Sequence, residues 1–159
     1  MAKNRIESNI ADSGTWYKIP EYKVMLIKDS NVPSDKKAIK SPADVVGMFK
    51  AYLDGVDREH FCIAMLDRKG NLLGLNTVSV DSISSSIVQP REVFKPAIII
   101  GASSIVLCHN HPSGDTSPSK EDIDVTRKLV EGGKILNIEI LDHVIIGDSY
   151  CSFKEKGLI

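Results

Sequence analysis

The chain has 159 residues, 42% of them hydrophobic, and a formal net charge of −1, which suits one domain with a sizeable core. The acidic and basic residues are interspersed, so charge gives no general reason to bind nucleic acid or a membrane surface. No apolar run approaches the roughly 20 residues of a membrane span and no apolar targeting segment opens the chain, so we expect a cytoplasmic location.

Residues 1–40 are predicted to form a tail that contains a candidate edge strand. The first residues are mostly polar, with an isolated aromatic pair, Trp16 and Tyr17, as a candidate anchor. Residues 21–28 alternate loosely between polar and apolar types, which predicts the edge strand, and residues 29–40 form a charged linker. The domain itself is predicted to span residues 41–159.

The domain is predicted to open with a helix and a β-hairpin. Ser41 is a capping hydroxyl, Pro42 suits the first helical position, and Asp44 lies near the positive end of the helix dipole. Apolar residues then recur at helical spacing, which predicts a face that packs on a sheet. Residues 61–66 and 72–80 are predicted strands, joined by a turn at residues 67–71.

The second half of the domain alternates predicted helices and strands. A serine-rich loop at residues 81–89 precedes a helix that starts at Pro90 and in which Pro96 is expected to introduce a kink. Residues 103–108 form a predicted buried strand. A helix capped by Ser117 and ended by residues 132–133 follows, and then three predicted strands at residues 135–141, 143–146 and 150–153. This alternation indicates a three-layer α/β fold.

Three cysteines, Cys62, Cys108 and Cys151, are widely spaced and lie mostly in apolar runs. An odd number of such residues is typical of buried thiols in a reducing compartment. We therefore expect free thiols and no disulfide framework.

Residues 109–122 place three candidate metal ligands within fourteen residues. His109 and His111 follow the predicted strand and point to one side of it, because residues two apart on a strand share a face. Asp122 lies near the start of the next helix, one turn after Ser119. Two imidazoles and a carboxylate suit a tetrahedral Zn²⁺ whose fourth position is left to water, as in a catalytic site.

Such an ion lowers the pKa of its water to roughly 7, which makes hydroxide available for attack on a carbonyl. The motif contains no base to take the proton of that water, so the base must come from elsewhere in the chain. Asp115 is expected to shape the turn. His143 has two interpretations: a hydrogen-bonded structural histidine, or a residue that supports a zinc ligand from behind.

The spacing of His109, His111, Ser119 and Asp122 resembles the JAMM (MPN/JAB) metalloprotease motif. Residues 90–94, 109–115 and 141–147 resemble the RadC branch of that superfamily, and the resemblance covers roughly residues 41–159. It implies a JAB/MPN fold, similar to cytidine deaminases: an α-β-α sandwich with a mixed sheet. It also implies His109, His111 and Asp122 as zinc ligands and Ser119 as the hydroxyl that stabilises the oxyanion.

JAMM enzymes also use a glutamate as general base, just before an early core strand. The matching position is Glu59, ahead of the predicted strand at residues 61–66. Glu92 is the rival candidate, in a segment that ordinary JAMM proteins share poorly. Glu59 and Ser119 also have plainer interpretations, as an exposed carboxylate in a charged run and as a hydroxyl that serves the helix start.

The resulting hypothesis is a zinc-dependent hydrolase of the JAMM type, a metallopeptidase or isopeptidase that attacks an amide of a peptide or protein substrate with a zinc-bound water. The alternative is a DNA-repair-associated nucleic-acid-binding module or metallonuclease of the RadC type, which the charge of the chain does not support. A zinc deaminase is excluded, because asparagine and histidine follow His109 and no C-x-x-C element exists.

Overall fold

The computed structural model describes residues 19–32, 34, 37–81 and 88–159. Within them, one sheet contains β1 (His60–Leu66), β2 (Leu72–Val80), β3 (Ser104–Asn110), β4 (Glu139–Ile146) and β5 (Tyr150–Ser152). The strand order is β2-β1-β3-β4-β5. β3 and β4 are parallel, whereas the other neighbouring strands are antiparallel. The predicted mixed sheet is therefore confirmed.

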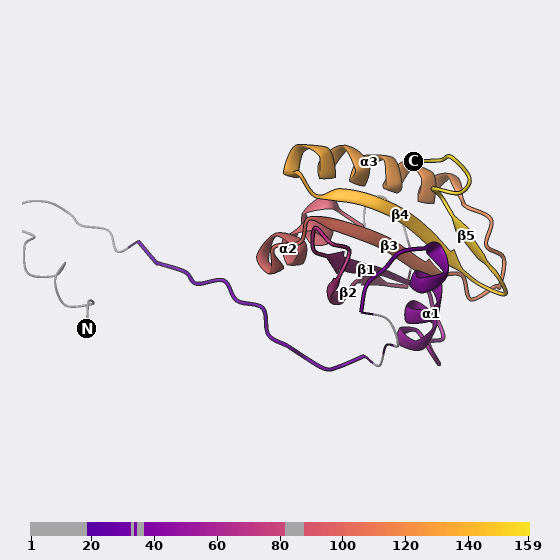
Figure 1. Ribbon diagram of the computed structural model, residues 1–159, viewed down its shortest axis with the longest axis horizontal. Helices are drawn as coiled ribbons and strands as arrows, with labels where there is room; N and C mark the ends of the chain where they lie inside the picture. Colours follow the sequence, from indigo (N-terminus) through magenta and orange to yellow (C-terminus); the bar gives the residue numbers. More distant parts are fainter. Residues whose placement is uncertain (1–18, 33, 35–36, 82–87) are drawn as a thin grey trace, which may run out of the picture.

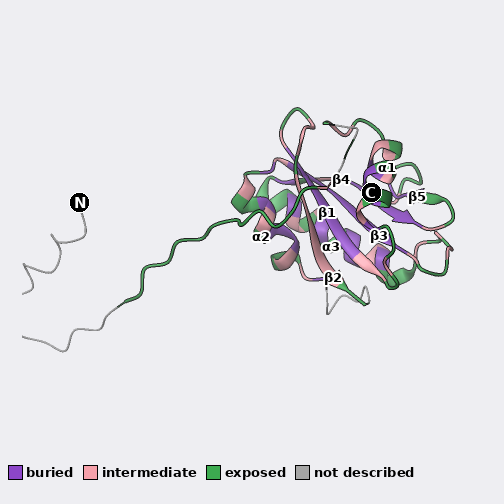
Figure 2. Ribbon diagram, turned by 90° about the horizontal axis from the view of Figure 1, so that it is seen from below, coloured by how far each residue is buried: buried purple, intermediate pink, exposed green. Residues whose placement is uncertain are grey.

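Helices cover both faces of this sheet. Figure 1 shows α3 (Lys120–Leu136) and α1 (Pro42–Tyr52) on opposite sides of it. The face packed by α3 and α2 (Pro90–Ile100) includes Phe61, Ile63, Met65, Ile105 and Leu107. The face packed by α1 includes Cys62, Ala64, Leu66, Val106 and Cys108. Alternate residues of β1 and β3 thus enter different layers, both strands are largely buried (Figure 2), and the fold is an α-β-α sandwich.

The first helix and the hairpin match their predictions. Ser41 caps α1 and forms a capping box with Asp44, while Pro42 occupies the first turn. β1 and β2 then pair antiparallel from His60 opposite Val80 to Leu66 opposite Leu72. Local signals were sufficient here because the cap, the turn and both strands are adjacent in the sequence.

The helix after the histidines begins later than predicted. Ser119, not Ser117, is the N-cap of α3. The reason is that Ser119 closes a capping box with Asp122, whereas the Ser117 N–H donates to the Asp115 carboxylate at 2.9 Å. Ser117 therefore belongs to the preceding turn.

The same helix runs through residues 132–133, which were predicted to end it. Asn137, in the left-handed conformation, provides the actual cap. A Cβ on Gly133 would collide with the Ile138 carbonyl oxygen, so this glycine serves close packing and does not end the helix. The predicted strand at residues 135–141 is therefore wrong in its first part, and β4 continues through the predicted break at residue 142.

The predicted edge strand at residues 21–28 is also wrong. These residues are exposed and belong to no strand, because nothing among the described residues pairs with their backbone groups. Residues 16–17 and most of the loop at residues 81–89 lie outside the described ranges. Among the helices that the structure describes, none is long and apolar enough to cross a membrane.

All three cysteines are free and buried, as predicted. Burial raises the pKa of Cys62 to about 11 and holds the pKa of Cys108 well above its ordinary value. Both thiols therefore stay protonated near neutral pH and behave as core residues.

Candidate metal centre

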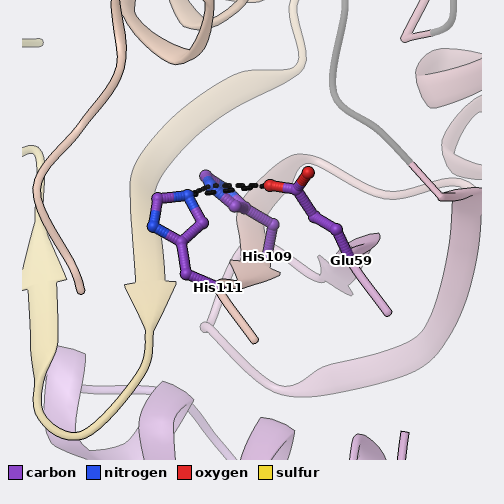
Figure 3. A group of neighbouring side chains, drawn as sticks. All are labelled: Glu59, His109 and His111. Atoms are coloured by element: carbon purple, nitrogen blue, oxygen red, sulfur yellow. Dashed lines mark hydrogen bonds and ion pairs between the residues drawn. The ribbon is translucent and has the colours of Figure 1, made fainter. Parts of the chain in front are cut away.

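Three side chains that are distant in the sequence meet at one end of β3. Glu59 precedes β1, His109 lies near the end of β3, and His111 follows that strand. Figure 3 shows the Glu59 carboxylate pointing toward both imidazoles. One ligand atom from each of the three lies within 4.8 Å of the others, so this group can hold a metal ion.

The alternation of β3 directs His109 toward α3. Leu107, two residues earlier, lies in the core cluster that β3 shares with α2 and α3, and residues two apart share a face. The His109 ring is fully buried and stacks on Phe61 with a centroid distance of 6.1 Å. Its Nε2 atom lies 3.4 Å from Oδ1 of Asp122, in the first turn of α3. The strand and the helix thereby bring a predicted nitrogen ligand and a predicted oxygen ligand together.

His111 lies in the turn after β3, which is held at several points. Its backbone N–H donates to the Ile146 carbonyl at 2.8 Å, and its Nδ1 donates to the Asp115 carbonyl, which can only accept. Nε2 of His111 is left 2.9 Å from Nε2 of His109. Because the Asp115 carboxylate also accepts from Ser117, the predicted turn-shaping role of Asp115 is confirmed.

Glu59 approaches both histidines, whereas Glu92 has other partners. Oε1 of Glu59 is 3.8 Å from His109 Nε2 and 3.6 Å from His111 Nε2, and 23% of the side chain is exposed. The carboxylate of Glu92, on α2, forms an ion pair with Lys95 at 2.7 Å. Of the two candidate bases, Glu59 is the one beside the imidazoles, and its role as base stays a prediction.

The residue between the two histidines holds the backbone around Glu59. Oδ1 of Asn110 accepts from the His60 N–H at 2.8 Å, and Nδ2 donates to the Arg58 carbonyl at 2.9 Å. The Glu59 carbonyl accepts from the Asp81 N–H at 2.9 Å. The peptide groups on both sides of Glu59 are therefore fixed. No local pattern in the sequence predicts this role, because the contact spans 50 residues.

Replacing Asn110 with aspartate is expected to destabilise the metal-free protein by about 1–3 kcal/mol. Aspartate has the same size and still accepts from the His60 N–H, but its second oxygen would face the Arg58 carbonyl without a proton between them. Asn110→Ala, which loses both bonds, is the companion variant. Urea unfolding measures the effect, and an Asn110→Asp variant within about 0.5 kcal/mol of wild type would show that the amide does not hold this backbone.

Ser119 and Asp122 form a closed pair of residues at the start of α3. Ser119 donates to Oδ2 of Asp122 through its N–H at 2.8 Å and through its hydroxyl at 2.6 Å, and its Oγ accepts from the Asp122 N–H at 3.0 Å. Asp122 is only 2% exposed, and its Oδ1 faces His109. The interpretation of Ser119 as a helix-start hydroxyl describes this geometry, while its oxyanion role stays a prediction.

Two further buried residues stand behind His109. Nδ1 of His109 is 2.8 Å from Nε2 of His143, and Nδ1 of His143 is 2.6 Å from Oγ1 of Thr126. His143 therefore contacts a candidate ligand, in agreement with its interpretation as a supporting residue. Thr126 was missed, and its position four residues after Asp122, on the same face of α3, was the available signal.

Burial keeps the inner histidines neutral. Desolvation lowers the pKa of His109 to about 3, against the opposing effect of Asp122. Desolvation also holds the pKa of His143 well below its ordinary value, with His109 acting in the same direction. A metal ligand must offer an unprotonated nitrogen, so His109 is in the required protonation state near neutral pH.

Lowering the pH is expected to destabilise the metal-free protein. The pKa of His109 is about 3 in the folded protein and 6.5 ordinarily, so between these values the unfolded chain binds more protons. The contribution of His109 to the free energy of unfolding is therefore fully present above about pH 6.5. Below that pH it decreases by up to about 1.4 kcal/mol per pH unit.

Urea unfolding at about pH 7 and about pH 5 should accordingly differ by about 2 kcal/mol from His109 alone. His143 acts in the same direction, because its pKa is also lowered. An unfolding free energy that stays constant or increases over this interval would contradict the burial of neutral histidines.

Comparisons with known proteins cover most of the chain. A family model described as RadC-like JAB domain matches residues 39–158. A UPF0758 protein of Desulfitobacterium hafniense is 50% identical over 131 residues, which is 82% of this chain and 58% of the relative. UPF0758 proteins of Syntrophomonas wolfei and Methanosarcina mazei are 53% and 49% identical over 129 residues, covering 78% and 80% of this chain and 55% and 56% of the relatives.

The chain therefore spans little more than half the length of these curated relatives. The family match nevertheless includes every strand of the sheet and all the side chains that converge at the end of β3. It confirms the resemblance seen in the histidine motif and its surroundings. The protein belongs to the RadC-like JAB domain family.

Proposed function

We propose that this protein is a zinc-dependent hydrolase of the JAMM type that cleaves a peptide or isopeptide amide. The observation that carries the proposal is the convergence of Glu59, His109 and His111 with Asp122 beside them. We also propose that the protein acts in the cytoplasm, a reducing compartment that suits its three buried free thiols.

The candidate ligand atoms lie near the spacing that a tetrahedral ion requires. Atoms at about 2.0–2.2 Å from such an ion lie roughly 3.3–3.6 Å from one another. His109 Nε2 and Asp122 Oδ1 are 3.4 Å apart, and His111 Nε2 lies 3.9 Å from Oδ2 of Asp122. The two Nε2 atoms are closer, at 2.9 Å, so the His111 ring would have to move away from His109 for both atoms to bind one tetrahedral ion. Imidazole nitrogen and carboxylate oxygen are also the donors that zinc accepts.

The two carboxylates differ in a way that supports separate roles. Asp122 is almost fully buried, and its Oδ2 is held twice by Ser119, so its Oδ1 is fixed in place as a ligand requires. Glu59 is more exposed, at 23% against 2% for Asp122, and can exchange protons with substrate and solvent. We therefore assign Asp122 as a ligand together with His109 and His111, and Glu59 as the general base.

When bound, zinc supplies a water of lowered pKa and a Lewis acid for the scissile carbonyl. Glu59 accepts the proton of the attacking water and returns it to the leaving amine, as one residue can serve first as base and then as acid. Asn110 keeps the Glu59 backbone in register with the histidines. Ser119 is the proposed donor to the oxyanion, once its hydroxyl turns away from Asp122.

Elemental analysis of tag-free protein tests the proposal. Wild type should contain about one zinc per chain, and His111→Ala should lose it. Peptide, isopeptide and duplex DNA substrates are then compared with the zinc-loaded protein. Absence of metal in wild type after zinc loading would overturn the proposal, and cleavage of DNA without cleavage of amides would replace the peptidase with a metallonuclease.

A further inference from the structure

The buried residues behind His109 form a continuous line of hydrogen bonds from α3 to the metal centre. Thr126 Oγ1 lies 2.6 Å from His143 Nδ1, and His143 Nε2 lies 2.8 Å from His109 Nδ1. All three side chains are at most 1% exposed. Bulk solvent does not reach them, so the positions of the protons in this line follow from the hydrogen bonds between these protein groups.

The direction of the line is set at Thr126. Its hydroxyl donates to the Asp122 carbonyl at 2.6 Å, and a carbonyl oxygen can only accept. A hydroxyl has only one proton, and the Asp122 carbonyl already accepts it. Thr126 Oγ1 can therefore only accept a hydrogen bond from His143 Nδ1. His143 Nδ1 must therefore donate.

The protonation of both rings follows from this direction. His143 is fully buried against the rings of Phe61 and Phe153, an apolar setting that favours neutral imidazole. A neutral imidazole has one N–H, so Nε2 of His143 carries a lone pair. His109 must then donate from Nδ1, which leaves its own Nε2 as a lone pair that faces Asp122 and His111.

His111 reaches the same state by another route. Its Nδ1 donates to the Asp115 carbonyl, so in the neutral ring its Nε2 also carries a lone pair. The two Nε2 atoms lie 2.9 Å apart. Two nitrogen lone pairs at this distance repel each other unless a cation lies between them. A metal ion that binds both Nε2 atoms removes this repulsion.

We propose that Thr126, acting through His143, is the positioning residue that holds His109 in the tautomer whose Nε2 binds the metal. The inference rests on the proposed metal site for its function, but not for its geometry. One hydroxyl thereby supports two ligands, because it contacts the backbone of Asp122 directly and the ring of His109 through His143.

Thr126→Val and Thr126→Ser form a matched pair for the test. Valine has nearly the shape of threonine but no hydroxyl, so Nδ1 of His143 loses its acceptor. His143 can then adopt the Nε2–H tautomer and donate to Nδ1 of His109, which places the proton of His109 on its own Nε2. Serine keeps the hydroxyl and should behave as wild type. Thr126→Ala removes the hydroxyl without adding a branch, and serves if the valine variant does not fold.

Two readouts are needed. Long-range ¹H–¹⁵N NMR of metal-free protein reports the tautomers of His109 and His143, and chelator competition reports zinc affinity. We expect the Nδ1–H tautomer of both histidines in wild type and Thr126→Ser. In Thr126→Val we expect its loss, with zinc bound about 10- to 100-fold more weakly.

An Nε2–H tautomer of His143 in wild type would overturn the inference without any variant. So would a folded Thr126→Val protein with the wild-type tautomers, or with the wild-type zinc affinity. Failure of wild type to bind zinc would instead overturn the proposed function, while the tautomers of the metal-free protein would still decide whether Thr126 sets the state of His109.

Discussion

Replacing Asp122 with alanine is expected to remove the bound zinc and to weaken the fold. The carboxylate faces His109 Nε2 at 3.4 Å and also accepts two hydrogen bonds from Ser119. Loss of a supporting residue alone costs about 10- to 100-fold in metal affinity, so loss of a ligand should exceed about 100-fold. The unfolding free energy of the metal-free protein should also fall by about 1–3 kcal/mol, since two hydrogen bonds from Ser119 to a buried, charged carboxylate are lost.

The first helix offers a matched control. Asp44 closes a capping box with Ser41 in α1, with the same three-residue spacing, but this box is exposed and contains no candidate ligand. Asp44→Ala should therefore cost about 0.5–2 kcal/mol and keep zinc. Chelator competition and urea unfolding measure both variants. If Asp122→Ala binds zinc as tightly as Asp44→Ala, Asp122 is only a capping residue.

Replacing Glu59 with glutamine should leave zinc in place and reduce turnover by about 10²- to 10⁴-fold, the usual contribution of a general base. Glutamine has the same length and shape but cannot accept the proton. The measurement is kcat on a peptide substrate that wild type cleaves, together with zinc per chain. Glu92→Gln is the matched control, because Glu92 forms ion pairs with Lys95 and Arg91 on α2, and it should keep both properties.

The two other outcomes of this experiment have distinct meanings. Full turnover in Glu59→Gln, with a loss in Glu92→Gln, would move the base to Glu92. Loss of zinc in Glu59→Gln would make Glu59 a ligand, which its inclusion in the group that can hold a metal ion permits. Asp122 would then be left to position His109 and to cap α3.

The parts of the fold that the sequence predicted well depend on neighbours along the chain. The α1 cap at Ser41 and the β1–β2 hairpin are examples. The end of α3 was missed because Gly133 has two possible uses, and only the position of the Ile138 carbonyl shows that close packing is the actual one. The strand at residues 21–28 was predicted wrongly, because its pattern favours pairing but no described residue pairs with it.

The candidate site divides in the same way. The motif spacing singled out His109, His111 and Asp122, because a short turn joins the strand to the helix. Of the supporting residues, His143 was named by one of its two interpretations, whereas Asn110 and Thr126 were missed. Asn110 acts on a segment 50 residues earlier, and Thr126 acts through His143, 17 residues later. Contacts of this kind are set by the order of strands in the sheet, which no local pattern contains.

The alternation of β3 has a consequence for errors in folding. His109 and Asn110 are neighbours, yet His109 lies in the candidate metal centre and Asn110 contacts the backbone around Glu59. A one-residue slip of β3 would turn each side chain to the other face of the sheet. The Asn110 amide would then lie where the His109 imidazole belongs. The same slip would force Leu107 and Cys108 to trade layers of the core. A slipped β3 that moves His109 away from the candidate site must also move Leu107 and Cys108 out of their core layers. The apolar residues of β3 therefore disfavour this misfolded register.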